Sequence, residues 1–360
     1  MIARTLSVRF ALFAAAAAGL LAGPGAPSAQ TNLRVGWCAR TITSAAAPYA
    51  IATKMGWYAK AGITVQLIPL PGSTDCVKLV ATKDLDAALP SVEPSAIIHA
   101  QGVKIRTFYT AYQGNIYGLA VPEDSPIRSI ADVRGKKIGV NSMASAGVII
   151  ARALAASNGM DPDKDVQIVV AGEGAQTAAL LRSNQVQVLS QFDTQYTLVE
   201  NAGIKLRMLD TKDIDRYPSN GFIALEENMP ARKQELIALA QGYAKGTIFA
   251  INNPEAAIRM LWEVFPQTRA TGKDEATALQ DDIKTLLARA ANWKLEKSGA
   301  KRWGENVEAN YDAYMDFLVK WGVVKVPVAG KDLISNAWID EINRFDPKAI
   351  AAEAKAYQYR

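Results

Sequence analysis

The sequence predicts an α/β protein built from two similar lobes, and three features of the chain predict it. First, Val65–Leu89 (VQLIPLPGSTDCVKLVATKDLDAAL) returns as Val166–Leu189 (VQIVVAGEGAQTAALLRSNQVQVL). Each copy reads as an apolar strand, a glycine-containing loop, an amphipathic helix and a second strand. Second, Leu33–Gly56 and Lys137–Gly159 are a matched pair ahead of these copies, each a strand, a polar loop and an alanine-rich helix that stops at glycine. Third, the chain after Pro230 shows helical periodicity only.

Short apolar runs bounded by turn residues predict the strands, and helices fill the gaps because parallel strands need crossover connections. The strands are expected at 33–37, 63–69, 85–89, 105–112, 117–121, 137–140, 166–170, 186–190, 205–209 and 221–225. Further helices are expected at 230–251, 254–265, 272–291, 300–321 and 332–343.

Two segments join polar turn residues to a short apolar strand, Gln113–Glu123 and Arg216–Glu226. We expect them to be paired hinge strands that carry the chain between the lobes. The first lobe is then 31–114 plus 222–360, and the second lobe is 115–221. In an open α/β sheet, ligands bind beyond the carboxyl ends of the strands. Two such lobes that face each other therefore make a cleft.

Residues 1–30 have the pattern of a secretory signal peptide. Arg4 and Arg9 precede the apolar run 11–22, and a Pro/Gly/Ser/Ala-rich exit offers a cleavage point near Ala29. An uncleaved anchor is the alternative, because Pro27 stands where a small residue is usual. Beyond this leader, no stretch approaches the roughly 20 apolar residues of a spanning helix. We therefore expect an exported, periplasmic protein.

Composition and motifs argue against nucleic-acid binding and against catalysis. Removing the leader lowers the formal net charge from +5 to +3, too little to attract nucleic acid. His99 is the single histidine and lies in an expected helix (SAIIHAQG), where a lone histidine is typical of packing, and the sequence offers no Ser-His-Asp or Cys-His set. The spacing of a metal-ligand cluster, a P-loop or a full dinucleotide-binding glycine motif does not occur. We expect no enzyme activity, metal or cofactor.

The chain has two cysteines, Cys38 and Cys76, each just beyond an early strand. An even pair in an oxidising compartment is a candidate disulfide, and neighbouring parallel strands could bring the two within range. Two buried free thiols are the alternative.

Four stretches carry a resemblance to a known family: PYAIATKMGWYAKAGITVQLIP (48–69), PGSTDCVKLVATKDLDAALPSVEPS (71–95), IADVRGKKIGV (130–140) and GFIALEENM (221–229). They resemble the periplasmic substrate-binding proteins of ABC importers, in the branch that serves nitrate, taurine, alkanesulfonates and thiamine-pyrimidine precursors. The resemblance implies a type II periplasmic-binding fold, a small organic ligand, an inner-membrane ABC permease as partner and a monomer. An enzyme on the same fold, like pyrimidine-precursor synthases, and a ligand-presenting sensor are the alternatives.

Polar and aromatic residues at the expected strand ends are the candidate ligand contacts. Arg suits bidentate binding of carboxylate or sulfonate, and a serine-headed helix such as the one at Ser145 exposes free N–H groups. Trp37 is expected to cover an apolar part of the ligand. The first half-site comprises Trp37, Arg40, Thr41, Ser44, Ser73, Glu93 and Tyr112, and the second comprises Ser142, Ser145, Asp193 and Tyr196. Ordinary helix capping and core packing are the alternatives; Tyr49 and Phe192 are aromatic residues in similar positions.

Glu93 and Asp193 occupy equivalent places in the two lobes, each just after a third strand. Facing each other, they would repel unless they bound a donor-rich or cationic ligand, such as a nitrogen heterocycle or an amine. Alternatively, each pairs with a nearby arginine or caps a helix. Arg40 favours an anionic ligand and the two acids favour the opposite, so the ligand's charge stays open.

Overall fold

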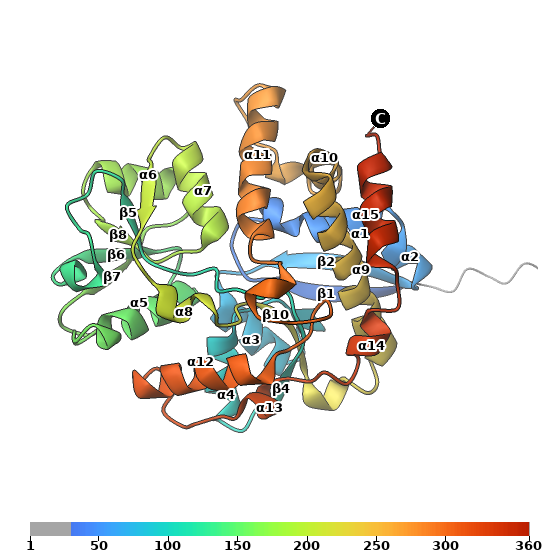
Figure 1. Ribbon diagram of the computed structural model, residues 1–360, viewed down its shortest axis with the longest axis horizontal. Coiled ribbons are helices and arrows are strands. Elements are labelled where there is room, and N and C mark those ends of the chain that lie inside the picture. The colour runs from blue at the N-terminus through green and yellow to red at the C-terminus, as the bar shows by residue number, and fades with distance from the viewer. Residues whose placement is uncertain (1–29, 360) are drawn as a thin grey trace, which may run out of the picture.

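The computed structural model describes residues 30–359, so the predicted leader lies outside the described residues except for Gln30. In these residues the strands form two five-stranded sheets, ordered β2-β1-β3-β10-β4 and β7-β6-β8-β5-β9. We call the parts of the molecule around them the first and the second lobe; the second is green in Figure 1. The strands are β1 (Thr31–Trp37), β2 (Ile63–Pro69), β3 (Ala87–Ala88), β4 (Ile105–Thr110), β5 (Ala120–Pro122), β6 (Lys137–Val140), β7 (Gln167–Val170), β8 (Val188–Leu189), β9 (Leu206–Met208) and β10 (Gly221–Leu225).

The two sheets share one topology, as the repeated sequence predicts. β1 pairs in parallel with β2 and β3, and β6 pairs in parallel with β7 and β8. The antiparallel strand of each sheet is the one that arrives from the other lobe: β10 lies between β3 and β4, and β5 lies between β8 and β9. All ten predicted strands occur, although β3, β4, β5, β8 and β9 are shorter than expected. The predicted α/β fold with mainly parallel sheets is confirmed, and the residue bounds of the lobes stay a prediction.

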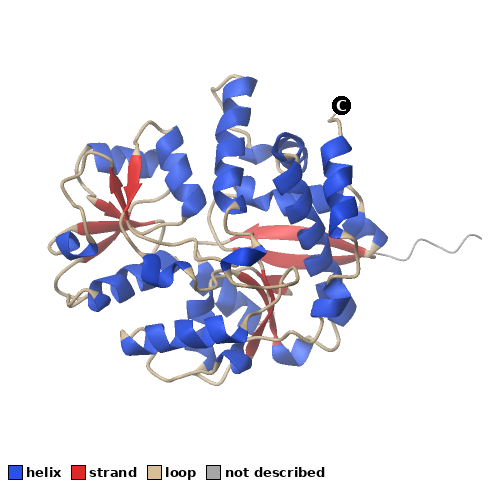
Figure 2. Ribbon diagram, viewed as in Figure 1, coloured by secondary structure: helices blue, strands red, loops and turns tan. Residues whose placement is uncertain are grey.

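Helices cover both sheets (Figure 2). The helices that precede β10 are α1 (Ala47–Lys54), α2 (Trp57–Lys60), α3 (Ser73–Ala81), α4 (Val92–His99), α5 (Ala146–Ser157), α6 (Ala175–Arg182), α7 (Asp193–Asn201) and α8 (Lys212–Asp215). The later ones are α9 (Lys233–Asn252), α10 (Pro254–Val264), α11 (Glu275–Ala290), α12 (Glu308–Lys320), α13 (Gly330–Leu333), α14 (Ile339–Ile342) and α15 (Pro347–Ala356). Within residues 30–359, no helix combines the length and the apolar character that a membrane crossing needs.

Two predicted helices were wrong in extent. The one expected at 300–321 begins only at Glu308, because buried Asn306 holds the preceding chain as a loop by accepting from Thr110 and donating to the Ser335 carbonyl at 3.0 Å. The one expected at 332–343 is interrupted, because Ser335 donates its backbone N–H to the Thr107 carbonyl of β4 at 2.9 Å. The intervening chain extends the first sheet, and α13 and α14 lie on either side of it. The final helix α15 was not predicted.

An aromatic cluster forms the core under the first sheet. Phe222 of β10 contacts the rings of Tyr49, Phe108, Tyr109 and Tyr243, with centroids 5.2–6.0 Å apart. Edge and tilted contacts of this kind contribute about 0.5–1.5 kcal/mol each beyond burial. Tyr49 is therefore a packed core residue, as the core-packing interpretation predicted.

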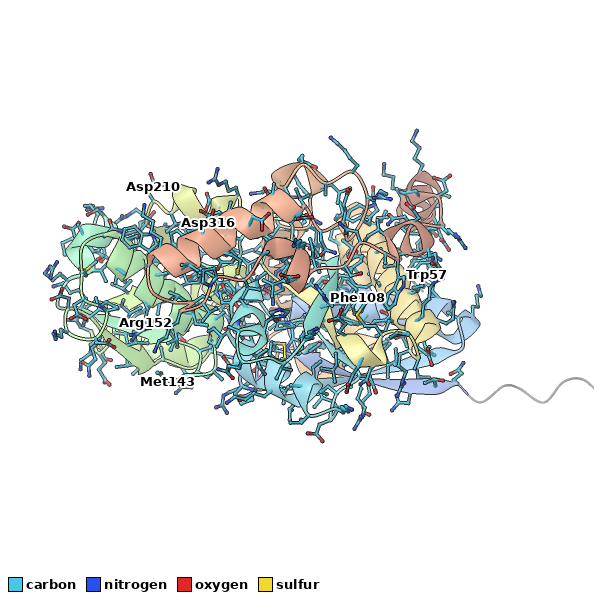
Figure 3. All side chains as sticks on the ribbon, turned by 90° about the horizontal axis from the view of Figure 1, so that it is seen from below. Trp57, Phe108, Met143, Arg152, Asp210 and Asp316 are labelled. Carbon is cyan, nitrogen blue, oxygen red and sulfur yellow. A yellow bond between two sulfur atoms is a disulfide. The ribbon has the colours of Figure 1, made fainter. Side chains whose placement is uncertain are left out.

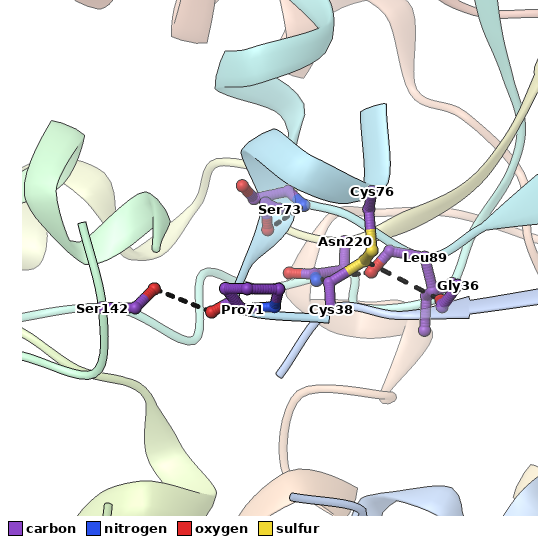
Figure 4. The surroundings of a disulfide bond; sticks show 9 residues. Gly36, Cys38, Pro71, Ser73, Cys76, Leu89, Ser142 and Asn220 are labelled. Atoms are coloured by element: carbon purple, nitrogen blue, oxygen red, sulfur yellow. Dashed lines mark hydrogen bonds between the residues drawn. A yellow bond between two sulfur atoms is a disulfide. The ribbon is translucent and has the colours of Figure 1, made fainter. Parts of the chain in front are cut away.

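Cys38 and Cys76 form the predicted disulfide, with their Cα atoms 5.8 Å apart. Because β1 and β2 run parallel with Trp37 opposite Pro69, the loops that follow them leave the same sheet edge. Cys38 lies in the first loop, and Cys76 lies in α3, just beyond the second. Figure 4 shows the bond near Pro71, in the loop after β2, and Ser73, the first residue of α3.

Replacing both cysteines by serine should lower the free energy of unfolding by about 3–4 kcal/mol, because the bridge closes a loop spanning 38 positions in sequence. Urea unfolding of the oxidised wild type and of the Cys38→Ser/Cys76→Ser variant measures the difference. Equal unfolding midpoints and slopes for the two proteins would contradict this expectation.

Candidate functional site

A small cavity lies where the loops of both lobes meet the crossing segments. Its volume is about 30 Å³, room for about two water molecules. It lies beyond the carboxyl ends of β1, β3 and β8, where an open α/β sheet binds ligands. The lining residues are Trp37, Cys38, Ala39, Leu89, Tyr112, Ile116, Tyr117, Phe192, Asn220 and Arg289.

Aromatic side chains form the walls. Trp37 of the first lobe is 7% exposed, and its indole N–H donates to the Thr41 carbonyl at 2.8 Å, which fixes the ring. Tyr117 of the first crossing meets Phe192 of the second lobe edge-on, with ring centroids 5.7 Å apart. Tyr112, which follows β4 just ahead of that crossing, is 2% exposed. Such flat, rigid surfaces suit a planar or hydrocarbon ligand.

Arg289, at the end of α11, is the one cation among the lining residues, and Asp193 of the second lobe neutralises it. Nε of Arg289 donates to both carboxylate oxygens, at 2.8 and 3.1 Å, and a terminal nitrogen donates to Oδ1 at 2.6 Å. The side chains are 4% and 12% exposed. Asn292 donates to the same carboxylate at 3.1 Å, and Tyr112 presents its ring face 4.1 Å from the guanidinium carbon. Burial opposes the charge of Arg289, but Asp193 raises its pKa above the usual value.

Glu93 lies behind the cavity wall and has a different environment. It is 1% exposed, one carboxyl oxygen accepts from the Tyr314 hydroxyl, and the other has no hydrogen-bond partner among the described residues. Burial raises the pKa of the Glu93 carboxyl group. The Glu93 carboxyl group adds to the rise that burial causes in the pKa of Tyr117. Glu93 and Asp193 therefore do not face each other as two unpaired acids. Asp193 forms an ion pair with Arg289, as the alternative interpretation predicted, and Glu93 accepts a hydrogen bond from Tyr314.

The lobes touch each other at a second place. Ser142 donates to the Pro71 carbonyl at 2.7 Å, a contact that Figure 4 shows, and the Thr74 N–H donates to the Ala144 carbonyl at 3.2 Å. A Cβ on Gly72 would lie 2.4 Å from that same carbonyl oxygen. The neighbouring Met143 points outward and is 59% exposed (Figure 3). The loop after β2 and the loop after β6 are therefore in backbone contact.

The expectation that α5 presents a free N-terminus to the cleft was wrong for this arrangement of the lobes. Ser145 caps the helix by accepting from the Gly147 N–H at 3.1 Å. Gly72 of the other lobe packs against the backbone of Ala144 and Ser145. The helix start is both capped and covered.

Other predicted site residues have structural partners in the protein. Ser44 donates to Asp282 at 3.0 Å, and Ser73 accepts from the Ser91 N–H at 3.1 Å. The Tyr196 hydroxyl donates to backbone carbonyls and accepts from the Gln191 N–H at 2.8 Å; its ring lines a wider hollow of about 580 Å³ that shares Tyr117 with the first cavity.

Arg40 and Thr41 are exposed and lie outside the cavity lining, so their contact with a ligand stays a prediction, and the arginine that lines the cavity is Arg289. Of the predicted set, Trp37 and Tyr112 line the cavity directly. Sequence reasoning missed Tyr117, Asn220 and Arg289 as lining residues. Tyr117 and Asn220 lie within the predicted crossing segments, which was a usable signal. Arg289 lies on a regular helix with no local motif around it, so only the fold could reveal it.

Two sheets of this order with a cavity between them define the periplasmic-binding-protein fold. The chain belongs to the NMT1/THI5-like family, whose model matches residues 43–257.

Several proteins to which this chain is similar are binding proteins by name. The riboflavin-binding protein RibY of Chloroflexus aurantiacus is 25% identical over 297 residues, 81% of this chain and 82% of that protein. The MOPS-bound alkanesulfonate-binding protein SsuA of Xanthomonas axonopodis pv. citri superimposes with a TM-score of 0.61 at 14% identity, covering 85% of this chain and 98% of its own. The nitrate-binding protein NrtA of Synechocystis PCC 6803 gives 0.58 at 17% identity, covering 91% and 89%. At these identities the two structures show the fold alone.

Replacing Glu93 by glutamine should stabilise the protein at pH 8 and not at pH 4. The pKa of Glu93 is raised in the folded state, whereas an unfolded glutamate titrates near 4.3. The folded state therefore holds a proton that the unfolded chain has already lost, and stability falls as the pH rises from about 4.3 through the folded pKa. Glutamine keeps an acceptor for Tyr314 and cannot ionise.

Thermal unfolding at both pH values measures this, and Glu296→Gln, at an exposed position, is the matched control. We expect a gain of a few °C for Glu93→Gln at pH 8 and none for the control. An equal gain at pH 4 and pH 8 would show that Glu93 is not titrating in this window.

Proposed function

We propose that this chain is an extracytoplasmic solute-binding protein that captures a small organic ligand between its lobes and delivers it to an ABC permease. The observation that carries the proposal is the aromatic-walled cavity at the carboxyl ends of strands from both sheets. The family and the binding proteins among its relatives support it. Export through the predicted signal peptide would place the protein in the periplasm, where it would act as a monomer.

The ligand would enter while the lobes are apart. The cavity of about 30 Å³ is far smaller than the roughly 300–1,000 Å³ of ordinary ligand pockets. Ligand entry therefore needs the lobes to separate, and closure would assemble the walls around it. We keep Gln113–Gly118 and Tyr217–Gly221 as the proposed hinges, since they link the two sheets.

We keep Trp37 and Tyr112 as proposed ligand contacts and add Tyr117 and Phe192 to them. Ser142 and Gly72 would hold the closed arrangement, and the remaining predicted polar residues would support the loops.

Trp37→Ala should weaken ligand binding by about 2 kcal/mol, roughly thirtyfold, as expected for a buried aromatic anchor. The ligand comes from a thermal-shift screen of riboflavin, sulfonates, nitrate, aromatic acids, amines and pyrimidines, in which a ligand at 100 times its dissociation constant adds about 2.7 kcal/mol.

Titration calorimetry then compares the wild type with Trp37→Ala and with Trp321→Ala, a tryptophan outside the cavity lining. Failure of every compound to stabilise the wild type would contradict the proposed function, as would chemical turnover of the compound that binds.

Gly72→Val should keep the lobes apart. The backbone of Gly72 is extended, with φ at 176°, so valine fits the local chain, and the obstacle to it is the Ala144 carbonyl of the other lobe. We expect ligand to reduce the radius of gyration of the wild type, but not that of the variant, and binding to weaken more than tenfold. Small-angle X-ray scattering with and without ligand measures the radius. A variant that closes and binds like the wild type would disprove the role of this contact.

A further inference from the structure

We infer that the cleft selects an uncharged, planar aromatic ligand over an oxyanion, and that Asp193 sets this selectivity by neutralising Arg289. This inference rests on the proposed function and narrows it to a ligand class. The family's relatives include sulfonate- and nitrate-binding proteins by name, so the fold alone leaves the ligand's charge open.

The first step is that Arg289 has its charge already matched. Nε and one terminal nitrogen are occupied by the Asp193 carboxylate, whose two oxygens also accept from Asn292 and from the Thr194 backbone N–H. Tyr112 covers one face of the guanidinium at 4.1 Å. An incoming sulfonate or nitrate would have to compete with a carboxylate that is held by four N–H donors of three residues. The edge of the guanidinium that Nε forms with one terminal nitrogen is already used.

The second step is that the other anion-accepting features are out of reach. Arg40 is exposed and does not line the cavity. The start of α5 is capped by Ser145 and covered by Gly72. Glu93 does not line the cavity, no cation of residues 30–359 is hydrogen-bonded or ion-paired to it, and its carboxyl group would repel an anion whenever ionised.

The third step is that the indole N–H of Trp37 and the side-chain amide of Asn220 have partners inside the protein. The indole N–H of Trp37 donates to the Thr41 carbonyl. The side-chain amide of Asn220 donates to the Leu89 carbonyl at 2.8 Å and accepts from Ser219 at 2.9 Å. What the cavity offers a ligand is mainly aromatic surface. Aromatic surface binds an uncharged ring by stacking and burial, with no charge to match.

Asp193→Asn should convert the site into one that accepts an anion. The substitution preserves the size of the side chain and removes the negative charge, which leaves Arg289 buried without its counter-ion. The double variant Asp193→Asn/Arg289→Gln is the matched control, because it removes both charges. The probes are riboflavin as the uncharged ring compound and MOPS, at pH 8, as the sulfonate. Calorimetric titration and competition between the two probes give each affinity.

We expect the wild type to bind riboflavin and to ignore millimolar MOPS. Asp193→Asn should bind MOPS at least tenfold more tightly than the wild type does, with an affinity that falls as salt is added. The double variant should lose that gain. A loss of packing alone would weaken both probes and would not create MOPS binding.

Wild-type protein that binds MOPS as tightly as riboflavin would overturn the inference and leave the proposed function standing. An Asp193→Asn variant that folds and gains no MOPS binding would also overturn it. If that variant does not fold, competition on the wild type decides: displacement of riboflavin by MOPS overturns the selectivity, and no displacement supports it. Wild type that binds no compound of the wider screen is the separate outcome that removes the proposed function, and this inference with it.

Discussion

The ion pair between Arg289 and Asp193 is the interaction on which the arrangement of the cleft depends. It joins α11, which packs on the first lobe, to the first turn of α7 in the second lobe, and both side chains are almost fully buried. Removing one partner of such a pair commonly costs about 3–5 kcal/mol, because the other charge is left buried and unmatched. The pair therefore fixes how the second lobe meets the first, and it places the cation of the cavity where its charge is cancelled.

The duplicated architecture explains why this pair and the loop contact at Gly72 lie at the same cleft. Each lobe contributes loops from equivalent strand ends, and each sheet receives one antiparallel strand from the crossing chain. The disulfide between Cys38 and Cys76 ties the loop after β1 to the first turn of α3, and the loop just ahead of α3 carries the contact with Ser142. A covalent bond therefore links the cleft segments within the first lobe, whereas hydrogen bonds and an ion pair link the first lobe to the second.

Much of the fold could be predicted from the sequence because periodic patterns of apolar residues mark its strands and helices. The repeat at Val65 and Val166 predicted both sheets, and the strand ends before Cys38 and Cys76 predicted their bridge. The site was harder to predict, because its decisive contacts join residues far apart in the chain. Arg289 reaches Asp193 across 96 positions in sequence, and nothing in the helical pattern around it marks it out. Arg40 stood at a strand end, where ligands are expected to bind, yet its side chain is exposed. The predicted helix bounds were wrong where tertiary hydrogen bonds of Asn306 and Ser335 prevailed over a local helical pattern.

The central claim is that an uncharged ring is held between the lobes while the Arg289–Asp193 pair stays intact. A crystal structure of the protein grown with riboflavin tests this most directly. We expect the ring against Trp37, with Tyr112, Tyr117 and Phe192 around it, and both hydrogen bonds from Arg289 Nε to Asp193 retained. Density for the ligand outside the cleft, or Asp193 displaced from Arg289 by a ligand group, would contradict it.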